Sequence, residues 1–218
     1  SEQLIEKESR TFVENLINWE GQTDLGVPWQ FSKYHYNKFG LFKNFLNFLK
    51  SIKRKFNGNE FDKDAFFDDY EILKLTGGIE LLKKYPLHNF PLEKNIFFFD
   101  KELGISANYR WLRYIYLSNQ IIKKNLINNF NVWLDIGSYY GGIQSILKNE
   151  LPDLNLILCD FNHQLCRSYV NLFHQFPNSK HILPNEAVKL NNLEKVDKGS
   201  IIYLPATNLE NFSHLKIP

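Results

Sequence analysis

An apolar run that leads into a glycine-rich turn is the feature that most constrains how this chain can fold. Residues Val132 to Ile136 read as a strand, and Gly137 to Gly142 follow it directly. A tight glycine turn between a strand and a helix brings backbone N–H groups and a helix N-terminus together, which is how nucleotide-like cofactors are held. The pattern predicts an α/β fold with a cofactor site where this strand ends.

A second predicted strand, over residues 155–160, supports the same interpretation because its apolar run, Leu156 to Cys159, ends in Asp160. Dinucleotide-binding folds place a carboxylate on a ribose hydroxyl roughly twenty residues after the glycine turn. The segments expected around these two strands are helices over residues 142–150 and 163–176, a short extended piece at 181–183 and a third strand at 201–204. Such alternation predicts a Rossmann-like parallel sheet with right-handed crossovers.

The chain before this sheet has a different pattern. Residues 1–105 are predicted to form a mainly helical region, and residues 106–218 the Rossmann-like domain. Apolar spacing indicates helices over 4–17, 41–56, 64–75 and from Gly77-Gly78 to just before Pro86, and Ser106 is the expected N-cap of a helix that leads to Lys124. The cluster Phe97-Phe98-Phe99 is expected to seat the N-terminal region on the following domain, against the ordinary interpretation of core packing.

Composition excludes several partners. The formal charge of +2, from 26 basic and 24 acidic side chains, gives no broad field for nucleic acid. Spanning a bilayer takes about eighteen apolar residues, and no apolar run in this sequence is that long. No secretory signal is recognised either. The sequence therefore predicts a cytoplasmic protein without a transmembrane segment. The basic end of the 41–56 helix leaves contact with an anionic membrane surface as an alternative to ordinary packing.

Cys159 and Cys166 are predicted to be reduced, structural thiols, with no metal site.

The glycine turn itself favours one class of cofactor. Tyr139 stands where a dinucleotide site has a second glycine that makes room for the pyrophosphate. A smaller charged group therefore fits better than a diphosphate. The amino-acid end of S-adenosylmethionine is such a group, and Asp135 is placed to orient its ammonium.

In these residues the chain resembles the class I S-adenosylmethionine-dependent methyltransferases. The resemblance lies in Leu134-Asp135-Ile136-Gly137-Ser138-Tyr139-Tyr140-Gly141, which matches their first motif except at Tyr139. More narrowly, the ending Tyr140-Gly141-Gly142, the strand end Asp160-Phe161 and Tyr169 look like the bacterial sugar O-methyltransferases associated with surface-polysaccharide genes. The resemblance covers about residues 106–218.

The resemblance implies a set of cofactor-binding residues: Asp135, Gly137, Ser138, Tyr139, Gly141, Asp160, Phe161, Thr207 and Asn208. By this resemblance Asp160 would hold the ribose hydroxyls, Phe161 would pack near the adenine, and Thr207 or Asn208 would lie at the adenine edge. The family's sheet has seven strands, so the sheet is expected to be incomplete at its C-terminal side and the general base to lie beyond Pro218.

No catalytic residue is assigned from the sequence. His163 is within reach as a base, against the ordinary interpretation of a hydrogen-bonded histidine at a helix N-terminus. Arg110 and Arg113 are candidates to meet an anionic sugar or the cofactor carboxylate, against surface ion pairs.

Three functions remain open at this point. The leading hypothesis is transfer of a methyl group from S-adenosylmethionine to a hydroxyl of a sugar or glycan. The second is an NAD(P)-dependent oxidoreductase or epimerase, which the glycine turn and Asp160 favour and Tyr139 opposes. The third is a non-catalytic, truncated binding module in which the aromatic N-terminal half contacts a partner. The oligomeric state is not predicted.

Overall fold

The computed structural model describes residues 2–15, 60–90, 96, 98–127, 132–192, 196–206, 210–211 and 213–215. The chain divides into two compact units, one formed by Ser1–Pro28 with Leu117–Pro218 and the other by Trp29–Tyr116. Among the described residues, none of the helices combines the length and the apolar character that crossing a bilayer requires.

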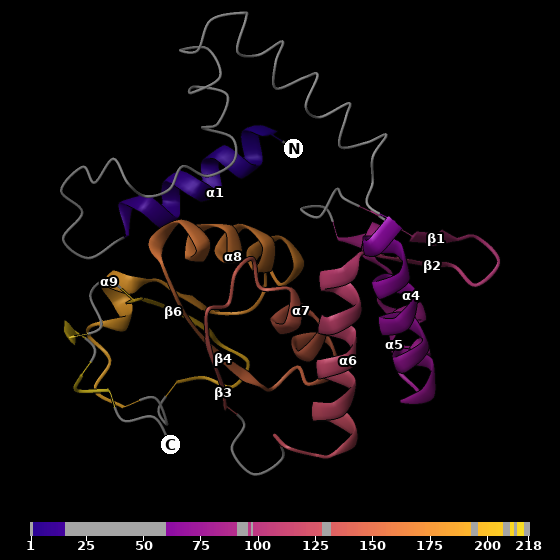
Figure 1. Ribbon diagram of the computed structural model, residues 1–218. Coiled ribbons are helices and arrows are strands. Elements are labelled where there is room, and N and C mark those ends of the chain that lie inside the picture. The colour runs from indigo at the N-terminus through magenta and orange to yellow at the C-terminus, as the bar shows by residue number, and fades with distance from the viewer. Residues whose placement is uncertain are drawn as a thin grey trace, which may run out of the picture. The chain divides into compact units, whose positions relative to one another are not determined.

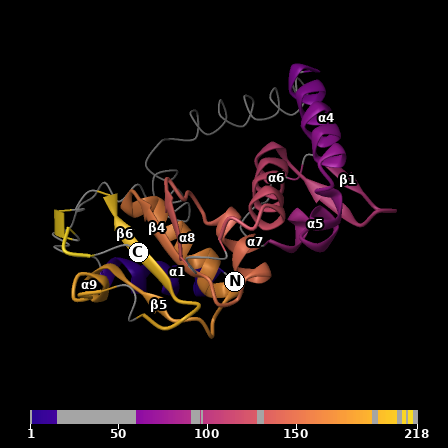
Figure 2. The ribbon, with the colours of Figure 1, turned by 90° about the horizontal axis from the view of Figure 1, so that it is seen from below.

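The first unit is built on a four-stranded parallel sheet (Figure 1, Figure 2). The strands, in spatial order, are β3 (Val132–Ile136), β4 (Asn155–Asp160), β6 (Ile201–Pro205) and β5 (His181–Ile182). Helices alternate with them along the chain: α7 (Gly142–Glu150), α8 (Asn162–Gln175) and the short α9 (Pro184–Ala187). The predicted α/β fold is confirmed, and β3, α7 and β4 have the predicted bounds. α9 was not anticipated.

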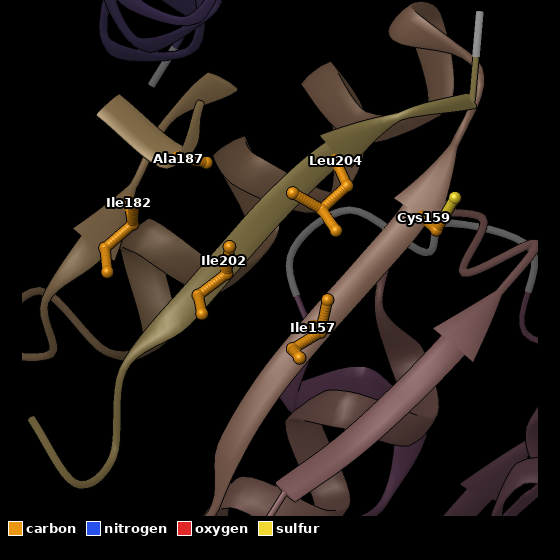
Figure 3. Packing of buried hydrophobic residues seen from close by; sticks show 6 residues of the cluster. All are labelled: Ile157, Cys159, Ile182, Ala187, Ile202 and Leu204. Carbon is orange, nitrogen blue, oxygen red and sulfur yellow. The ribbon is translucent and has the colours of Figure 1, made fainter. Parts of the chain in front are cut away.

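The two central strands are buried on both faces. Every residue of β4 and β6 is buried, which explains why both read as unbroken apolar runs rather than alternating ones. On one face Ile157 and Cys159 of β4 pack with Ile202 and Leu204 of β6, next to Ala187 of α9 (Figure 3). This packing fixes the register of the strands, and therefore where each strand ends.

The opposite face of the sheet carries α8 and α1 (Glu2–Glu14), which run side by side. Phe12 of α1 is fully buried, and its ring lies 5.6 Å from the Tyr169 ring and 6.0 Å from the Tyr203 ring. The N–H of Asn185 also donates to the Asn15 carbonyl at 3.0 Å. α1 thus packs in the same unit as the sheet. The predicted domain boundary between residues 105 and 106 stays a prediction.

A buried lysine ties together the loops at the amino end of the sheet. The ammonium of Lys148, on α7, donates to the carbonyls of Pro152, Leu154 and Gly199. Gly199 has φ +78°, and a Cβ at this position would lie 2.7 Å from the lysine nitrogen. The lysine therefore occupies space that any side chain at position 199 would need.

The second unit holds α4 (Glu60–Leu75), α5 (Ile79–Lys84), a 3-10 turn η1 (Leu87–Asn89) and an antiparallel hairpin of β1 (Phe98–Asp100) and β2 (Ile105–Ala107). The hairpin was not predicted. Phe98 packs against Phe66 and Tyr70 of α4, as the core-packing interpretation predicts. The predicted helix over 41–56, and with it the suggested membrane contact, lies outside the described residues.

α6 (Tyr109–Lys123) contributes residues to both units, and it begins later than predicted. Its N-cap is Asn108, whose Oδ1 accepts from the Trp111 N–H at 2.9 Å. Ser106, the predicted N-cap, lies in β2, and its hydroxyl oxygen accepts from the His88 N–H at 2.9 Å. The Ser106 side chain therefore forms a hydrogen bond from the hairpin and does not cap the helix.

Candidate functional site

The predicted cofactor residues gather at the carboxyl ends of two neighbouring strands. β3 pairs in parallel with β4, with Ile136 opposite Cys159. The loop from Gly137 to Gly141 leaves β3, and Asp160-Phe161 leaves β4. This end of a parallel sheet is where open α/β folds bind their ligands.

The loop has an unusual backbone. Gly137, Tyr139 and Gly141 have φ of +86°, +53° and +81°, the left-handed region that L-residues rarely adopt. At Gly141, the residue before α7, a Cβ would lie 3.2 Å from the Leu172 side chain. Glycine is required there both by conformation and by the closeness of α8.

Tyr139 occupies this left-handed region without being glycine. Such a conformation costs an L-residue roughly 1–2 kcal/mol. The Tyr139 N–H donates to Asp160 Oδ2 at 2.8 Å, and its ring lies 5.1 Å from the Tyr140 ring. The position that breaks the glycine pattern in the sequence therefore keeps the backbone shape that a glycine would adopt.

Asp160 joins the two strand ends. One carboxylate oxygen accepts from the Tyr139 N–H, and the other accepts from the Phe161 N–H at 2.7 Å. The residue is buried, so its carboxylate is shielded from bulk water. The glycine turn and the acidic strand end are thus joined by a hydrogen bond, although they are separate features in the sequence.

Asp135, in β3, is the second acid of the site. Gln144 of α7 donates its amide hydrogen to Asp135 Oδ2. Burial raises the pKa of the Asp135 carboxyl, the bond from Gln144 lowers it, and the negative charge of Asp160 raises it again. The two carboxylates thus act on each other electrostatically. Gln144 was not predicted as part of the site, although its place two residues after Gly142 at the start of α7 is a signal that could have suggested it.

Three further features complete the surroundings of the turn. Phe161 is 58% exposed, and its ring is parallel to that of His163, with centroids 6.1 Å apart and planes at 8°. Ser138 is buried, and among the described residues its hydroxyl has no hydrogen-bond partner. A Cβ added to Gly137 would have no atom within 4 Å. The site therefore offers an exposed aromatic face, an unsatisfied hydroxyl and open space beside the turn.

The remaining predicted residues lie elsewhere. Thr207 and Asn208 are outside the described residues. Arg113 is exposed and pairs with Asp69 at 3.5 Å, in the unit of α4, as the surface interpretation predicted. Arg110 is also exposed. In the described part of the chain, no group of three His, Cys, Asp or Glu side chains is arranged to hold a metal ion.

A comparison of the chain with protein-family models, curated proteins and solved structures finds no match. The structure shows an α/β fold with a small parallel sheet. The functional argument therefore depends on the chemistry of the site and on the motif residues.

Proposed function

We propose that this chain binds S-adenosylmethionine at the carboxyl ends of β3 and β4 and transfers its methyl group to a hydroxyl of a sugar. The cofactor-binding residues in this proposal are Asp135, Gly137, Ser138, Tyr139, Gly141, Asp160 and Phe161.

The observation that carries the proposal is the pair of coupled carboxylates beside the turn. Burial raises the pKa of the Asp135 carboxyl, and the negative charge of Asp160 raises it further. A cationic ligand relieves this repulsion, whereas an anionic one adds to it. S-adenosylmethionine carries two positive groups, the sulfonium and the ammonium, and one carboxylate, while NAD brings a diphosphate. The charge of the site therefore favours the former.

The other side chains fit the same ligand. The exposed Phe161 ring provides an apolar face for a flat base, and the space beside Gly137 leaves the turn accessible. Asp135 would face the ammonium, with Gln144 holding the orientation of its carboxylate. Bound S-adenosylmethionine supplies an electrophilic methyl group for in-line attack by an acceptor oxygen, whose proton leaves to a base. The contacts of the described residues assign no such base.

The acceptor and the compartment are inferred from other evidence. The choice of a sugar hydroxyl depends on the resemblance of the motif residues to bacterial sugar O-methyltransferases. The assignment to the cytoplasm rests on the free thiols of Cys159 and Cys166, which are typical of reducing compartments.

The test is a thermal-shift titration of the full chain with S-adenosylhomocysteine and, in parallel, with NAD. A ligand at a hundred times its dissociation constant stabilises by about 2.7 kcal/mol, which raises Tm by about 5–10 °C in a chain of this size. We expect a rise with S-adenosylhomocysteine alone. Incubation with S-adenosylmethionine and a panel of sugars, followed by mass spectrometry, then tests the acceptor through the mass of one added methylene.

Two outcomes would contradict the proposal. A rise with NAD alone would assign the site to an oxidoreductase or epimerase. A cooperative melt that neither ligand shifts would favour a non-catalytic binding module.

A further inference from the structure

Three consecutive carbonyl groups of the glycine turn, those of Tyr139, Tyr140 and Gly141, accept hydrogen bonds from buried side chains. The Tyr139 carbonyl accepts from the Ser168 hydroxyl at 2.6 Å, and the Tyr140 carbonyl accepts from the Asn171 amide at 3.0 Å. The Gly141 carbonyl accepts from the Ser145 hydroxyl at 2.8 Å. Three consecutive peptide groups are thus held from the protein side.

Two of these side chains, Asn171 and Ser145, are joined to each other and to Gln175, whereas Ser168 meets them only through the backbone of the turn. Asn171 donates to the Ser145 oxygen at 3.2 Å, and Gln175 donates to the same oxygen at 3.1 Å and to Asn171 Oδ1 at 2.8 Å. Ser168, Asn171 and Gln175 are spaced three and four residues apart, so they lie on one face of α8. We call Ser168, Asn171, Gln175 and Ser145 the α8 clamp.

The clamp lies at buried positions. If stability alone mattered, apolar side chains could fill these positions. Ser145, Ser168 and Asn171 are all buried, with at most 1% of each residue exposed. Buried polar groups are costly unless they are fully bonded. Here their bonds go to the backbone of one loop, which indicates that the shape of this loop is what they determine.

The clamp also reaches the acidic end of β4. Tyr139 is bonded on both sides, since its carbonyl accepts from Ser168 and its N–H donates to Asp160. In a planar trans peptide, the carbonyl and the following N–H point in opposite directions. With the carbonyls of Tyr139 and Tyr140 turned toward α8, the N–H groups that follow them are turned away from it.

We propose that the α8 clamp pre-forms the glycine turn for its ligand, and that Ser168 and Asn171 are positioning residues for cofactor binding. The inference rests on the proposed function for the identity of the ligand, S-adenosylmethionine. Ser168 acts through Tyr139, whose N–H orients the Asp160 carboxylate. Asn171 acts through the next peptide and through Ser145 at the start of α7.

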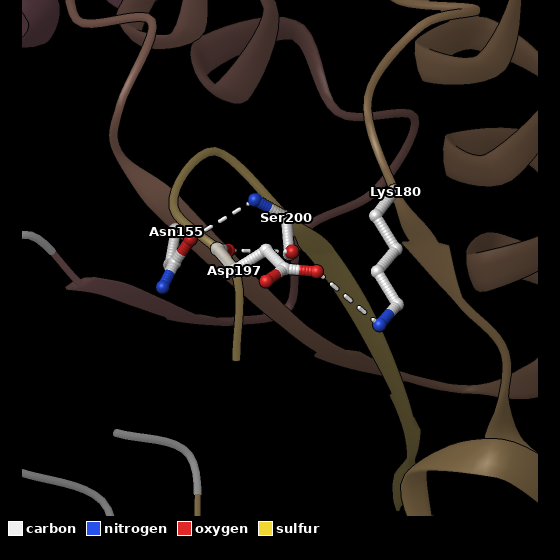
Figure 4. A network of polar contacts seen from close by, with 4 residues as sticks. All are labelled: Asn155, Lys180, Asp197 and Ser200. Carbon is white, nitrogen blue, oxygen red and sulfur yellow. Dashed lines mark hydrogen bonds and ion pairs between the residues drawn. The ribbon is translucent and has the colours of Figure 1, made fainter. Parts of the chain in front are cut away.

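The test compares Ser168→Ala with a matched control, Ser200→Ala. Both serines are fully buried, and both donate to a backbone carbonyl, Ser200 to that of Asp197 at 2.7 Å. Ser200 lies at the amino end of β6, in the network with Asn155, Asp197 and Lys180 (Figure 4). The two variants remove the same chemical group from opposite ends of the sheet.

Two quantities are measured in the full chain: hydrogen exchange of the peptide that covers residues 137–145, without ligand, and the Kd for S-adenosylhomocysteine by calorimetry. We expect Ser168→Ala to accelerate exchange in this peptide and to raise Kd about tenfold. Ser200→Ala is expected to lower Tm by about as much as Ser168→Ala does. It should change neither the exchange of this peptide nor the Kd. If Ser168→Ala fails to fold, Gln175→Ala, which removes the outer member of the clamp, gives the same comparison with a smaller effect.

Equal exchange of the turn in the two serine variants would overturn the clamp. An unchanged Kd in Ser168→Ala, with normal binding by the wild type, would overturn its role in positioning. If the wild type does not bind S-adenosylhomocysteine, the proposed function is wrong, and hydrogen exchange still decides whether the clamp holds the turn.

Discussion

The two ends of the parallel sheet are built in opposite ways. At the amino end, the ammonium of Lys148 meets three backbone carbonyls, and Asn155 accepts from the Ser200 N–H at 2.9 Å. At the carboxyl end, Asp135 and Asp160 repel each other, Tyr139 adopts a left-handed backbone, and Phe161 is exposed. The amino end pairs its buried charge with backbone carbonyls, whereas the carboxyl end leaves the Ser138 hydroxyl without a partner among the described residues.

This difference separates stability from function. Strained or repelling groups persist where the surrounding structure holds them, and they concentrate at binding sites. Substitutions at the amino end should therefore destabilise the fold without affecting the ligand. Substitutions at the carboxyl end should affect the ligand and, at one position, even stabilise the fold.

The largest effect is expected at the amino end. Lys148→Met keeps the length of the side chain but leaves its carbonyl partners without this donor, which should cost about 2–4 kcal/mol and lower Tm by about 10 °C. Lys180→Met is the control, because Lys180 is exposed and its 3.5 Å pair with Asp197 contributes little. Differential scanning calorimetry measures both. Similar Tm values for the two variants would show that Lys148 does not hold this end of the sheet.

The next effect is expected at the carboxyl end. Asp160→Asn removes the charge of the carboxylate. It also places the NH₂ group of the new amide against one of the two backbone N–H groups that Asp160 accepts from. Affinity for S-adenosylhomocysteine should therefore fall at least about tenfold, or about 1.4 kcal/mol. Asp153→Asn removes the same charge from the turn before β4 and should leave the affinity unchanged. Calorimetric titration measures both variants. An equal loss in the two would mean that net charge, rather than the site, determines binding.

A smaller effect of opposite sign is expected at Asp135. Because the folded-state pKa of this carboxyl is raised, its charged form costs stability at neutral pH. Asp135→Asn keeps an oxygen that can accept from Gln144 while removing the repulsion with Asp160. It should raise Tm by a few degrees and weaken ligand binding. A lowered Tm, measured at pH 7, would contradict the view that the buried charge of Asp135, next to that of Asp160, costs stability.

The smallest effect concerns pH and lies near the amino end. His181, the first residue of β5, donates from Nε2 to the Phe176 carbonyl, so its Nδ1 accepts from the Tyr203 hydroxyl at 3.0 Å. Burial lowers the pKa of this imidazole below its ordinary 6.5, the bond to Phe176 raises it, and the charge of Lys148 lowers it.

Because the folded state binds this proton less well, the stability that His181 contributes is present above pH 6.5 and is lost as the pH falls through the folded-state pKa. Tm should therefore fall more between pH 7.5 and pH 5 in the wild type than in His181→Gln. If Tm falls equally with pH in the wild type and in His181→Gln, His181 does not contribute to the acid sensitivity of the fold.

The sheet could be predicted because its two central strands, β4 and β6, are buried on both faces and its strands are bounded by clear breaks. β3, α7 and β4 follow from unbroken apolar runs and from the glycine turn. The β1–β2 hairpin could not be predicted, since its strands have only three residues each and Phe97-Phe98-Phe99 lacks the alternation of a half-buried strand. α1 shows an apolar face in the sequence, but the periodicity does not say which helix this face meets.

The sequence predicts that the turn, Asp135 and Asp160 lie near one another, but it does not predict the side chains that hold the turn. Asp135, Asp160 and the turn stand out because their spacing follows from strand length. Ser168, Asn171 and Gln175 have no such signal, because polar residues on a helix ordinarily face solvent. Their role depends on the crossing of α8 beneath the turn, which only the folded chain reveals.

The contact between Lys148 and Gly199 has an evolutionary consequence. The lysine nitrogen fills the space of a side chain that residue 199 lacks, so the two positions, fifty-one residues apart, cannot vary independently. A lineage that gains a side chain at 199 must displace both the lysine nitrogen and the Pro152 carbonyl oxygen, which would lie 2.8 Å from the added Cβ. A lineage that loses the lysine is relieved of one of three constraints on the glycine, the others being this carbonyl and the positive φ. In sequences descended from a common ancestor with this chain, these two positions should therefore change together.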